Sequence, residues 1–168
     1  MRILALCGSL RAQSTNLSLL SAAQELVGAS LHIYRDLGDL PHYNADVEEA
    51  GIPGPVAALR KYVQDASVVL ISSPEYARGV PGSLKNALDW LVGGPEFYAK
   101  PYALWSASDR AVNVDAALRL TLDTMSGRRV EGGCVTVPLL GKRPTAAEIL
   151  AEPSARRALE AALVALRT

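Results

Sequence analysis

The chain begins with the sequence MRILALCGSLRAQSTN, residues Met1–Asn16, which predicts a buried strand followed directly by a helix. Ile3–Cys7 is a continuous apolar run of strand length, typical of strands that are covered on both faces, as in parallel sheets. Gly8 ends this run. The apolar spacing between Leu19 and Val27 then indicates a helix. This order predicts the first unit of an α/β fold.

The loop between this strand and helix is rich in hydrogen-bond donors, namely Ser9, Arg11, Ser14, Thr15 and Asn16. A helix N-terminus attracts anions, because its first N–H groups lack partners and its dipole is positive there. The loop has one glycine and no Gly-Lys-Ser/Thr sequence, so it is neither a Walker loop nor a dinucleotide fingerprint. Its hydroxyls favour a terminal phosphate monoester. An ordinary strand-to-helix loop with a capped helix remains an equally open interpretation.

The composition predicts one domain over residues 1–168 and excludes several classes of partner. The net charge is zero and no long charged run occurs, so we expect neither nucleic acid nor a membrane surface as partner. We find no bilayer-spanning stretch or signal peptide, and expect a cytoplasmic protein. Cys7 and Cys134 lie in apolar runs, which indicates buried thiols in a reducing compartment. His32 and His42 stand in unlike contexts, so no metal site is expected.

Further strands alternate with helices along the rest of the chain. Strands are predicted at Leu31–Tyr34, Ser67–Ser73, Lys100–Ser108 with its following loop, and Gly133–Pro138; helices follow Pro55, Pro81, Asn113 and Pro153, and a long loop covers Arg35–Pro55. This alternation predicts a doubly wound α/β fold, a five-stranded parallel sheet with helices on both faces. The common order for five strands is 2-1-3-4-5, in which ligands bind at the carboxyl ends of strands 1 and 3.

Three polar loops should therefore meet at one edge of the sheet. They are Gly8–Arg11, Ser73–Tyr76 and Ser106–Ser108. Pro74 keeps its loop out of helix, which should leave the backbone amides of Glu75 and Tyr76 free to meet a ligand. On these residues alone, the Tyr76 ring is better explained as a loop aromatic that caps the core.

Two blocks of sequence resemble a known family, the NADPH-dependent FMN reductases and related quinone and chromate reductases. The first block is GSLRAQSTN, Gly8–Asn16, and the second is PEYARGVPGSLKNALDW, Pro74–Trp90. LPHYNAD, Leu40–Asp46, is similar to a third segment of the same family. The resemblance covers nearly the whole chain. It implies a flavodoxin-like fold, in agreement with the pattern of strands and helices.

The resemblance also implies a cofactor, a reaction and a set of binding residues. The cofactor would be FMN, with NADPH or NADH as hydride donor and a small acceptor such as a flavin or quinone. The phosphate of FMN would lie against Ser9, Arg11, Ser14, Thr15 and Asn16, and its ring against Pro74, Glu75, Tyr76, Ala77 and Ser106. No catalytic side chain is implied, because the flavin carries the chemistry. Glu75 as a general acid is a minor alternative.

The chain departs from the family pattern at two places beside the expected flavin ring. Ala77 stands where the family has asparagine, and Asp109–Asn113 replaces a run that is often rich in glycine. These changes predict reversible and weaker FMN binding. Two other functions stay open. One is a flavodoxin-like electron carrier, although a chain with zero net charge shows no evident acidic surface for docking a partner protein. The other is a binding module that has lost the flavin, which the missing glycines make credible.

We expect the protein to form a homodimer or homotetramer. Apolar residues near the third predicted helix exceed what one core face needs, namely Val80, Leu91, Val92, Phe97 and Tyr98. With the long loop at Arg35–Pro55, they predict a surface for self-association.

Overall fold

A computed structural model describes residues 1–139 and 143–167, and six parallel strands form one sheet within them. The strands are β1 (Ile3–Cys7), β2 (Leu31–Tyr34), β3 (Val68–Ser72), β4 (Pro101–Ser106), β5 (Arg128–Arg129) and β6 (Val135–Thr136). Their order is β2-β1-β3-β4-β5, and β6 also pairs with β4. The predicted doubly wound order 2-1-3-4-5 is confirmed.

The predicted fifth strand differs from the observed one, because the structure divides this edge between β5 and β6. A 3₁₀ turn at Glu131–Gly133 separates the two short strands. Trp105 Nε1 donates a hydrogen bond to the carbonyl oxygen of Gly133 at 2.8 Å. Gly133 thus lies in the turn and not in the strand ladder, and pairing with β4 resumes at Val135.

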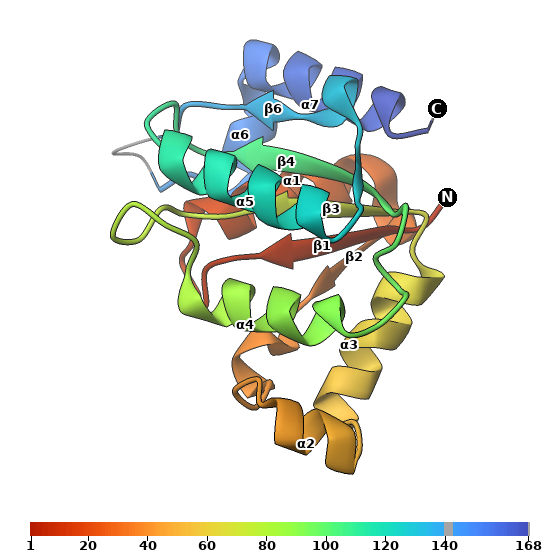
Figure 1. The fold of residues 1–168 in the computed structure, drawn as a ribbon. Helices are drawn as coiled ribbons and strands as arrows, with labels where there is room; N and C mark the ends of the chain where they lie inside the picture. The colour runs from red at the N-terminus through yellow and green to blue at the C-terminus, as the bar shows by residue number, and fades with distance from the viewer. Residues whose placement is uncertain (140–142, 168) are drawn as a thin grey trace.

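Helices cover both faces of the sheet, as predicted (Figure 1). One face packs against α1 (Thr15–Val27), α6 (Ala146–Ala151) and α7 (Pro153–Ala165), and the other against α3 (Gly54–Asp65), α4 (Gly82–Val92) and α5 (Val112–Thr124). Ile3 and Ala5 of β1 belong to the first core, and Leu4 and Leu6 to the second. Every residue of β1 is therefore buried, which explains its unbroken apolar run.

The segment predicted as one long loop contains two helical turns. A 3₁₀ turn covers Asp36–Asp39, and α2 covers Ala45–Ala50. Asn44 caps α2, since its Oδ1 accepts a hydrogen bond from the Asp46 N–H at 2.9 Å. No residue of α2 is buried, so the sequence carries no apolar spacing from which this helix could be predicted.

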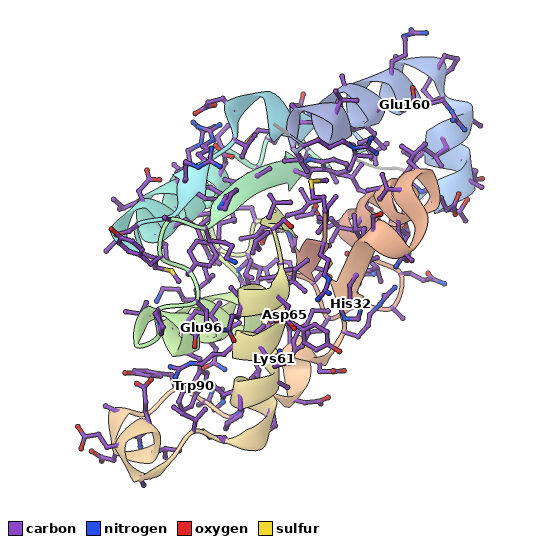
Figure 2. All side chains as sticks on the ribbon, turned by 90° about the vertical axis from the view of Figure 1, so that its right-hand side faces the viewer. His32, Lys61, Asp65, Trp90, Glu96 and Glu160 are labelled. Atoms are coloured by element: carbon purple, nitrogen blue, oxygen red, sulfur yellow. The ribbon has the colours of Figure 1, made fainter. Side chains whose placement is uncertain are left out.

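Side chains of α4 fix this segment in place. Asn86 Nδ2 and Trp90 Nε1 both donate to the carbonyl oxygen of Pro41, at 2.9 and 2.8 Å. Asn86 Oδ1 accepts from the Tyr43 N–H at 2.8 Å. Figure 2 shows Trp90 on the side of α4 that faces the α2 segment. The structure thus explains Asn86 and Trp90 of the second sequence block by contacts inside the protein.

The apolar residues expected to drive self-association divide into buried and exposed groups. Leu91 and Phe97 are each 1% exposed and belong to the core, so the prediction is wrong for them. Val92 and Tyr98 are exposed by 62% and 75%.

Within residues 1–139 and 143–167, no helix has both the length and the apolar character needed to cross a membrane.

Candidate functional site

A hollow of about 610 Å³ opens at the carboxyl edge of the sheet, beyond β1, β3 and β4. It is lined by Thr15 and Asn16 from the start of α1, by Ser73–Glu75 after β3, by Ser106–Ser108, Arg110 and Ala111 after β4, and by Leu139 and Arg143. Small-molecule sites commonly measure about 300–1,000 Å³. Two of the three predicted loops, Ser73–Tyr76 and Ser106–Ser108, therefore contribute to a hollow of suitable size, and the start of α1 lines it in place of Gly8–Arg11.

Gly8 allows the ends of β1 and β3 to approach closely below this hollow. Its N–H donates to the carbonyl oxygen of Ser72 at 2.9 Å, and a Cβ at this position would overlap the side chain of Ser73. Ser72 Oγ donates to Asn16 Oδ1 at 2.9 Å in a buried contact. Because Asn16 Oδ1 already accepts this bond from Ser72, its Nδ2 group is the part of the side chain that remains to donate to a ligand.

The N-terminus of α1 supplies further donors. Ser14 caps this helix through a 3.4 Å hydrogen bond from the Leu17 N–H to Ser14 Oγ. The N–H groups of Thr15 and Asn16 are the first of the helix and have no acceptor within it. Both residues line the hollow. Of the predicted phosphate donors, Thr15 and Asn16 therefore line the hollow, while the Ser14 side chain acts as the helix cap.

Ser9 and Arg11 lie beside this hollow rather than in its lining. They border a smaller hollow of about 150 Å³, together with Tyr34 and Arg35. Ser9 Oγ accepts a hydrogen bond from the Arg11 N–H at 3.3 Å, which shapes the loop. The Arg11 residue is exposed. The structure thus places the first block's donors around two neighbouring hollows.

Tyr76 and Ala77 form a tight turn instead of a free loop. The Tyr76 N–H donates to the Gly79 carbonyl at 3.1 Å, and the Gly79 N–H donates back to the Tyr76 carbonyl at 2.9 Å. The expectation of a free Tyr76 amide is therefore wrong. Ala77 and Arg78 have φ values of 48° and 59°, as in type I′ turns, which favour Asn-Gly. This conformation gives a backbone reason for the family's asparagine at position 77. The Tyr76 side chain is 50% exposed and does not cap the core.

Glu75 is bound to the start of α5. Its Oε2 accepts from the N–H groups of Asn113 and Val114 at 2.9 and 3.1 Å, and its Oε1 accepts from Asn113 Nδ2 at 3.0 Å. The side-chain amide of Asn113, and after it the backbone amide of Val114, hold the pKa of the Glu75 carboxyl below its ordinary value of 4.5. A group that stays ionised is a poor general acid, which argues against that alternative.

Hydroxyl groups shape the loop after β4, where the family often has glycine. Ser106 Oγ donates to the Ser108 carbonyl at 2.6 Å and accepts from the Ser108 N–H at 3.2 Å. The Arg110 N–H donates to Ser108 Oγ at 3.1 Å. Such local bonds bend the chain without requiring glycine. Ser106 lines the hollow through a loop that it helps to form.

The lining also contains residues of the predicted segments that were not singled out as binding residues. Ser73, Ala107 and Ser108 belong to the loops predicted at this edge, and Arg110 and Ala111 to the segment expected beside the flavin ring. Leu139 and Arg143 were not predicted. Leu139 and Arg143 follow the last strand, where the sequence gives no sign that the chain turns back toward the site.

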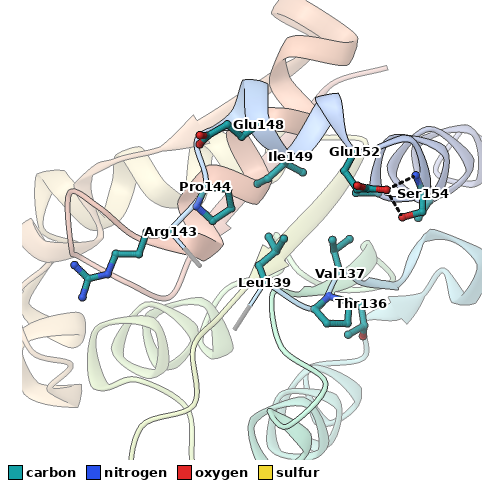
Figure 3. A pocket seen from close by; sticks show the side chains of 12 residues that line it. Thr136, Val137, Leu139, Arg143, Pro144, Glu148, Ile149, Glu152 and Ser154 are labelled. Atoms are coloured by element: carbon teal, nitrogen blue, oxygen red, sulfur yellow. Dashed lines mark hydrogen bonds between the residues drawn. The ribbon is translucent and has the colours of Figure 1, made fainter. Parts of the chain in front are cut away.

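A second hollow of about 690 Å³ lies between the end of β6 and helices α6 and α7 (Figure 3). Leu139 and Arg143 line both hollows, so the two are neighbours. Its acidic residues take part in helix caps, since Glu148 accepts from the Thr145 N–H and Glu152 from the Ser154 N–H. The hollow at the three strand ends carries more uncommitted polar groups and is the better candidate site.

The charge of the candidate site is positive. Arg110 and Arg143 are in its lining, and Glu75, the one carboxylate among the lining residues that the structure describes, is already hydrogen-bonded to the N-terminus of α5. Together with the α1 N-terminus, these cations favour an anionic ligand. The donor set therefore fits a phosphorylated cofactor such as FMN.

Comparison with known proteins identifies the family. A family model described as NADPH-dependent FMN reductase matches residues 1–139. An NAD(P)H:quinone oxidoreductase of Solanum tuberosum is 41% identical over 112 residues, covering 63% of this chain and 58% of that protein. An NAD(P)H-dependent FMN reductase of Pseudomonas aeruginosa is 38% identical over 110 residues, covering 64% and 60%. The chain thus spans less than two thirds of each relative.

A solved structure supports the same assignment over the whole chain. FerB, a flavoenzyme NAD(P)H:(acceptor) oxidoreductase from Paracoccus denitrificans, superposes with a TM-score of 0.77 and 25% sequence identity. The similarity covers 99% of this chain and 95% of FerB. Since the family model also matches 139 of the 168 residues, the chain belongs to the NADPH-dependent FMN reductase family.

Proposed function

We propose that this protein is an NAD(P)H-dependent FMN reductase that passes electrons to a small acceptor such as a flavin or quinone. One observation carries the proposal: donors from three strand ends surround a 610 Å³ hollow with uncommitted positive charge. The names of the relatives support the same reaction class.

The described residues divide into a phosphate region and a ring region. The N–H groups of Thr15 and Asn16, with Asn16 Nδ2, would hold the FMN phosphate, and Arg11 would add charge from the side of the loop. The ring would lie between the loop at Ser73–Glu75 and the loop at Ser106–Ala111.

Bound FMN would supply the hydride chemistry, accepting a hydride from NADPH or NADH and passing electrons onward. The two loops would hold one face of the ring, leaving the other open for the nicotinamide and then the acceptor. We assign no nucleophile or general acid to the chain, and Glu75 stays ionised through its bonds to α5.

We further propose a homodimer or homotetramer, with Val92 and Tyr98 in the contact surface. The C-terminal end of α4 lies against α2, because a Cβ on Gly93 would meet the side chain of Glu48. Val47 of α2 is 40% exposed and adds apolar surface near this contact. Sedimentation at micromolar concentration should show a species larger than the monomer, and a monomer alone would contradict the proposal.

We place the protein in the cytoplasm, where its two free cysteines would stay reduced.

The test of the proposed reaction is oxidation of NADPH and NADH by the purified protein, followed through nucleotide absorbance, with and without added FMN. Benzoquinone serves as acceptor. We expect FMN-dependent, saturable oxidation with stoichiometric quinone reduction. Flavin binding without such oxidation would favour an electron carrier or a non-catalytic module.

A further inference from the structure

Helix α5 lacks a cap from its own neighbourhood. Its N-cap residue is Ala111, which provides no side-chain hydrogen bond. The N–H groups of Asn113 and Val114, in the first turn, donate instead to Glu75 Oε2. A carboxylate at a helix N-terminus is favourable both as acceptor and as a negative charge near the positive end of the dipole. Glu75 thus caps a helix that begins 37 residues later in the chain.

This cap joins the two walls of the candidate site. Glu75 lines the hollow from the loop after β3, and Arg110 and Ala111 line it from the loop that leads into α5. Asn113 adds a side-chain bond to Glu75 Oε1 at 3.0 Å. Asn113 belongs to the stretch that departs from the family's glycine-rich pattern. The residues that replace the glycine-rich run therefore add a side-chain contact, from Asn113 to Glu75.

The backbone around Glu75 is restrained on both sides. Pro74 has a fixed φ, and Ser73 Oγ donates to the Pro74 carbonyl at 3.0 Å. On the other side, Tyr76 enters the turn closed by two hydrogen bonds with Gly79. Because the backbone is restrained on both sides, the Glu75 carboxylate has a fixed position. Its hydrogen bonds therefore fix the position of the first turn of α5.

We propose that Glu75 and Asn113 form a clasp that fixes the spacing of the two loops that hold the flavin ring. Glu75 is a positioning residue, and it does not move a proton in the reaction. This inference rests on the proposed binding of FMN. It assigns the ring region, and not the phosphate region, as the part of the site that depends on the clasp.

The proposal predicts a particular pattern of ligand affinities. Glu75→Gln keeps the size of the side chain but leaves one acceptor oxygen for three donors, so the loops lose their fixed spacing. FMN and riboflavin should then both bind about tenfold more weakly, by the same factor, because both carry the ring. A variant that disturbs the phosphate region would instead weaken FMN alone.

The matched control is Asp115→Asn. Asp115 also lies in the first turn of α5 and pairs with Arg119 at 2.6 Å, but it does not contact the loop after β3 in any described interaction. Both variants remove a negative charge from the same helix end and should lower the urea midpoint of the apo-protein. Only Glu75→Gln should also lower flavin affinity, which a merely structural role would not produce.

The experiment is a titration of wild-type protein and each variant with FMN and with riboflavin, following flavin fluorescence. Asn113→Ala is included because it keeps both backbone bonds to Glu75 and should fold even if Glu75→Gln does not. It should weaken both ligands about threefold. Unchanged affinity in both clasp variants, or loss for FMN alone, would overturn the clasp. Absence of flavin binding by the wild type would instead overturn the proposed function on which it rests.

Discussion

Trp90 donates a hydrogen bond from its indole Nε1 to the carbonyl oxygen of Pro41 at 2.8 Å, which joins α4 to the segment carrying α2. Asn86 reinforces this contact, since its amide bonds both the Pro41 carbonyl and the Tyr43 N–H. These residues belong to two separate sequence blocks, and Pro41 and Trp90 lie 49 positions apart. The second half of the Pro74–Trp90 block therefore maintains the fold, while its first half borders the candidate site.

We predict that Asn86→Ala destabilises the protein by about 1–3 kcal/mol, because it removes a donor to Pro41 and leaves the Tyr43 N–H without its acceptor. Urea unfolding followed by circular dichroism measures this change. The control is Lys85→Gln on the same helix, which breaks only the exposed pair with Asp89 and should cost about 0–1 kcal/mol. Equal effects of the two substitutions would show that the contact with Pro41 contributes little.

Arg11→Ala should weaken FMN binding while leaving riboflavin binding nearly unchanged, because only FMN carries a phosphate. A charge-assisted hydrogen bond contributes about 1.5–3 kcal/mol, so the expected loss for FMN is on the order of tenfold to a hundredfold. Parallel fluorescence titrations with the two flavins provide the measurement. Equal losses for both ligands would place Arg11 outside the phosphate region.

Ala77→Asn and Ala77→Gly should both stabilise the protein, by about 1 kcal/mol, because alanine is unfavourable at the positive φ of 48°. Ala77→Asn should in addition tighten FMN binding up to about tenfold, through a side-chain amide that glycine lacks. Thermal unfolding and FMN titration separate the two effects. A loss of stability in both variants would contradict the left-handed turn at Ala77–Arg78.

The stability that Glu75 contributes should depend on pH. Its pKa is held below the ordinary value of 4.5 in the folded protein, chiefly by the Asn113 side-chain amide, with the Val114 amide next and Arg78 adding charge. A depressed carboxyl pKa stabilises the folded state above the unfolded pKa, and this contribution disappears as pH falls through the folded value. In urea unfolding, the gap between wild type and Glu75→Gln should be constant near neutral pH and shrink below about pH 4. A stability difference that widens in acid would contradict a lowered pKa of Glu75 in the folded protein.

The order of strands and the convergence of the loops could be predicted from the sequence, because they depend on strong local patterns. The buried run Ile3–Cys7, the alternation of strands with helices, and the handedness of crossovers together leave few topologies. The division of the last strand into β5 and β6 could not be predicted, since the 3₁₀ turn at Glu131–Gly133 that separates them has no signal in the local apolar pattern. Its Gly133 carbonyl accepts a bond from Trp105, 28 positions away.

The detailed assignment of the candidate site was harder to predict, because it depends on where side chains turn at the ends of strands. Thr15, Asn16, Pro74, Glu75 and Ser106 line the hollow, while Ser9, Arg11, Ser14, Tyr76 and Ala77 lie beside it or shape its loops. Sequence alone does not show that Ser14 is consumed by a helix cap or that Glu75 reaches α5. The bonds of Glu75 to Asn113 and Val114 span 38 and 39 positions, and residue patterns along the chain do not encode such contacts. The Ser14 cap is local, but the sequence offers several neighbouring hydroxyl groups and does not select Ser14 among them.

Titration of the apo-protein with FMN, following the quenching of flavin fluorescence, tests the central claim most directly. The visible spectrum of the protein as purified shows first how much flavin it retains, and a partly or wholly colourless preparation agrees with the departures at Ala77 and Asp109–Asn113. We predict saturable binding in the micromolar range, because the N–H groups at the start of α1, Asn16 Nδ2 and the nearby Arg11 remain to hold the phosphate. No binding at millimolar FMN would contradict the assignment of this hollow as a flavin site.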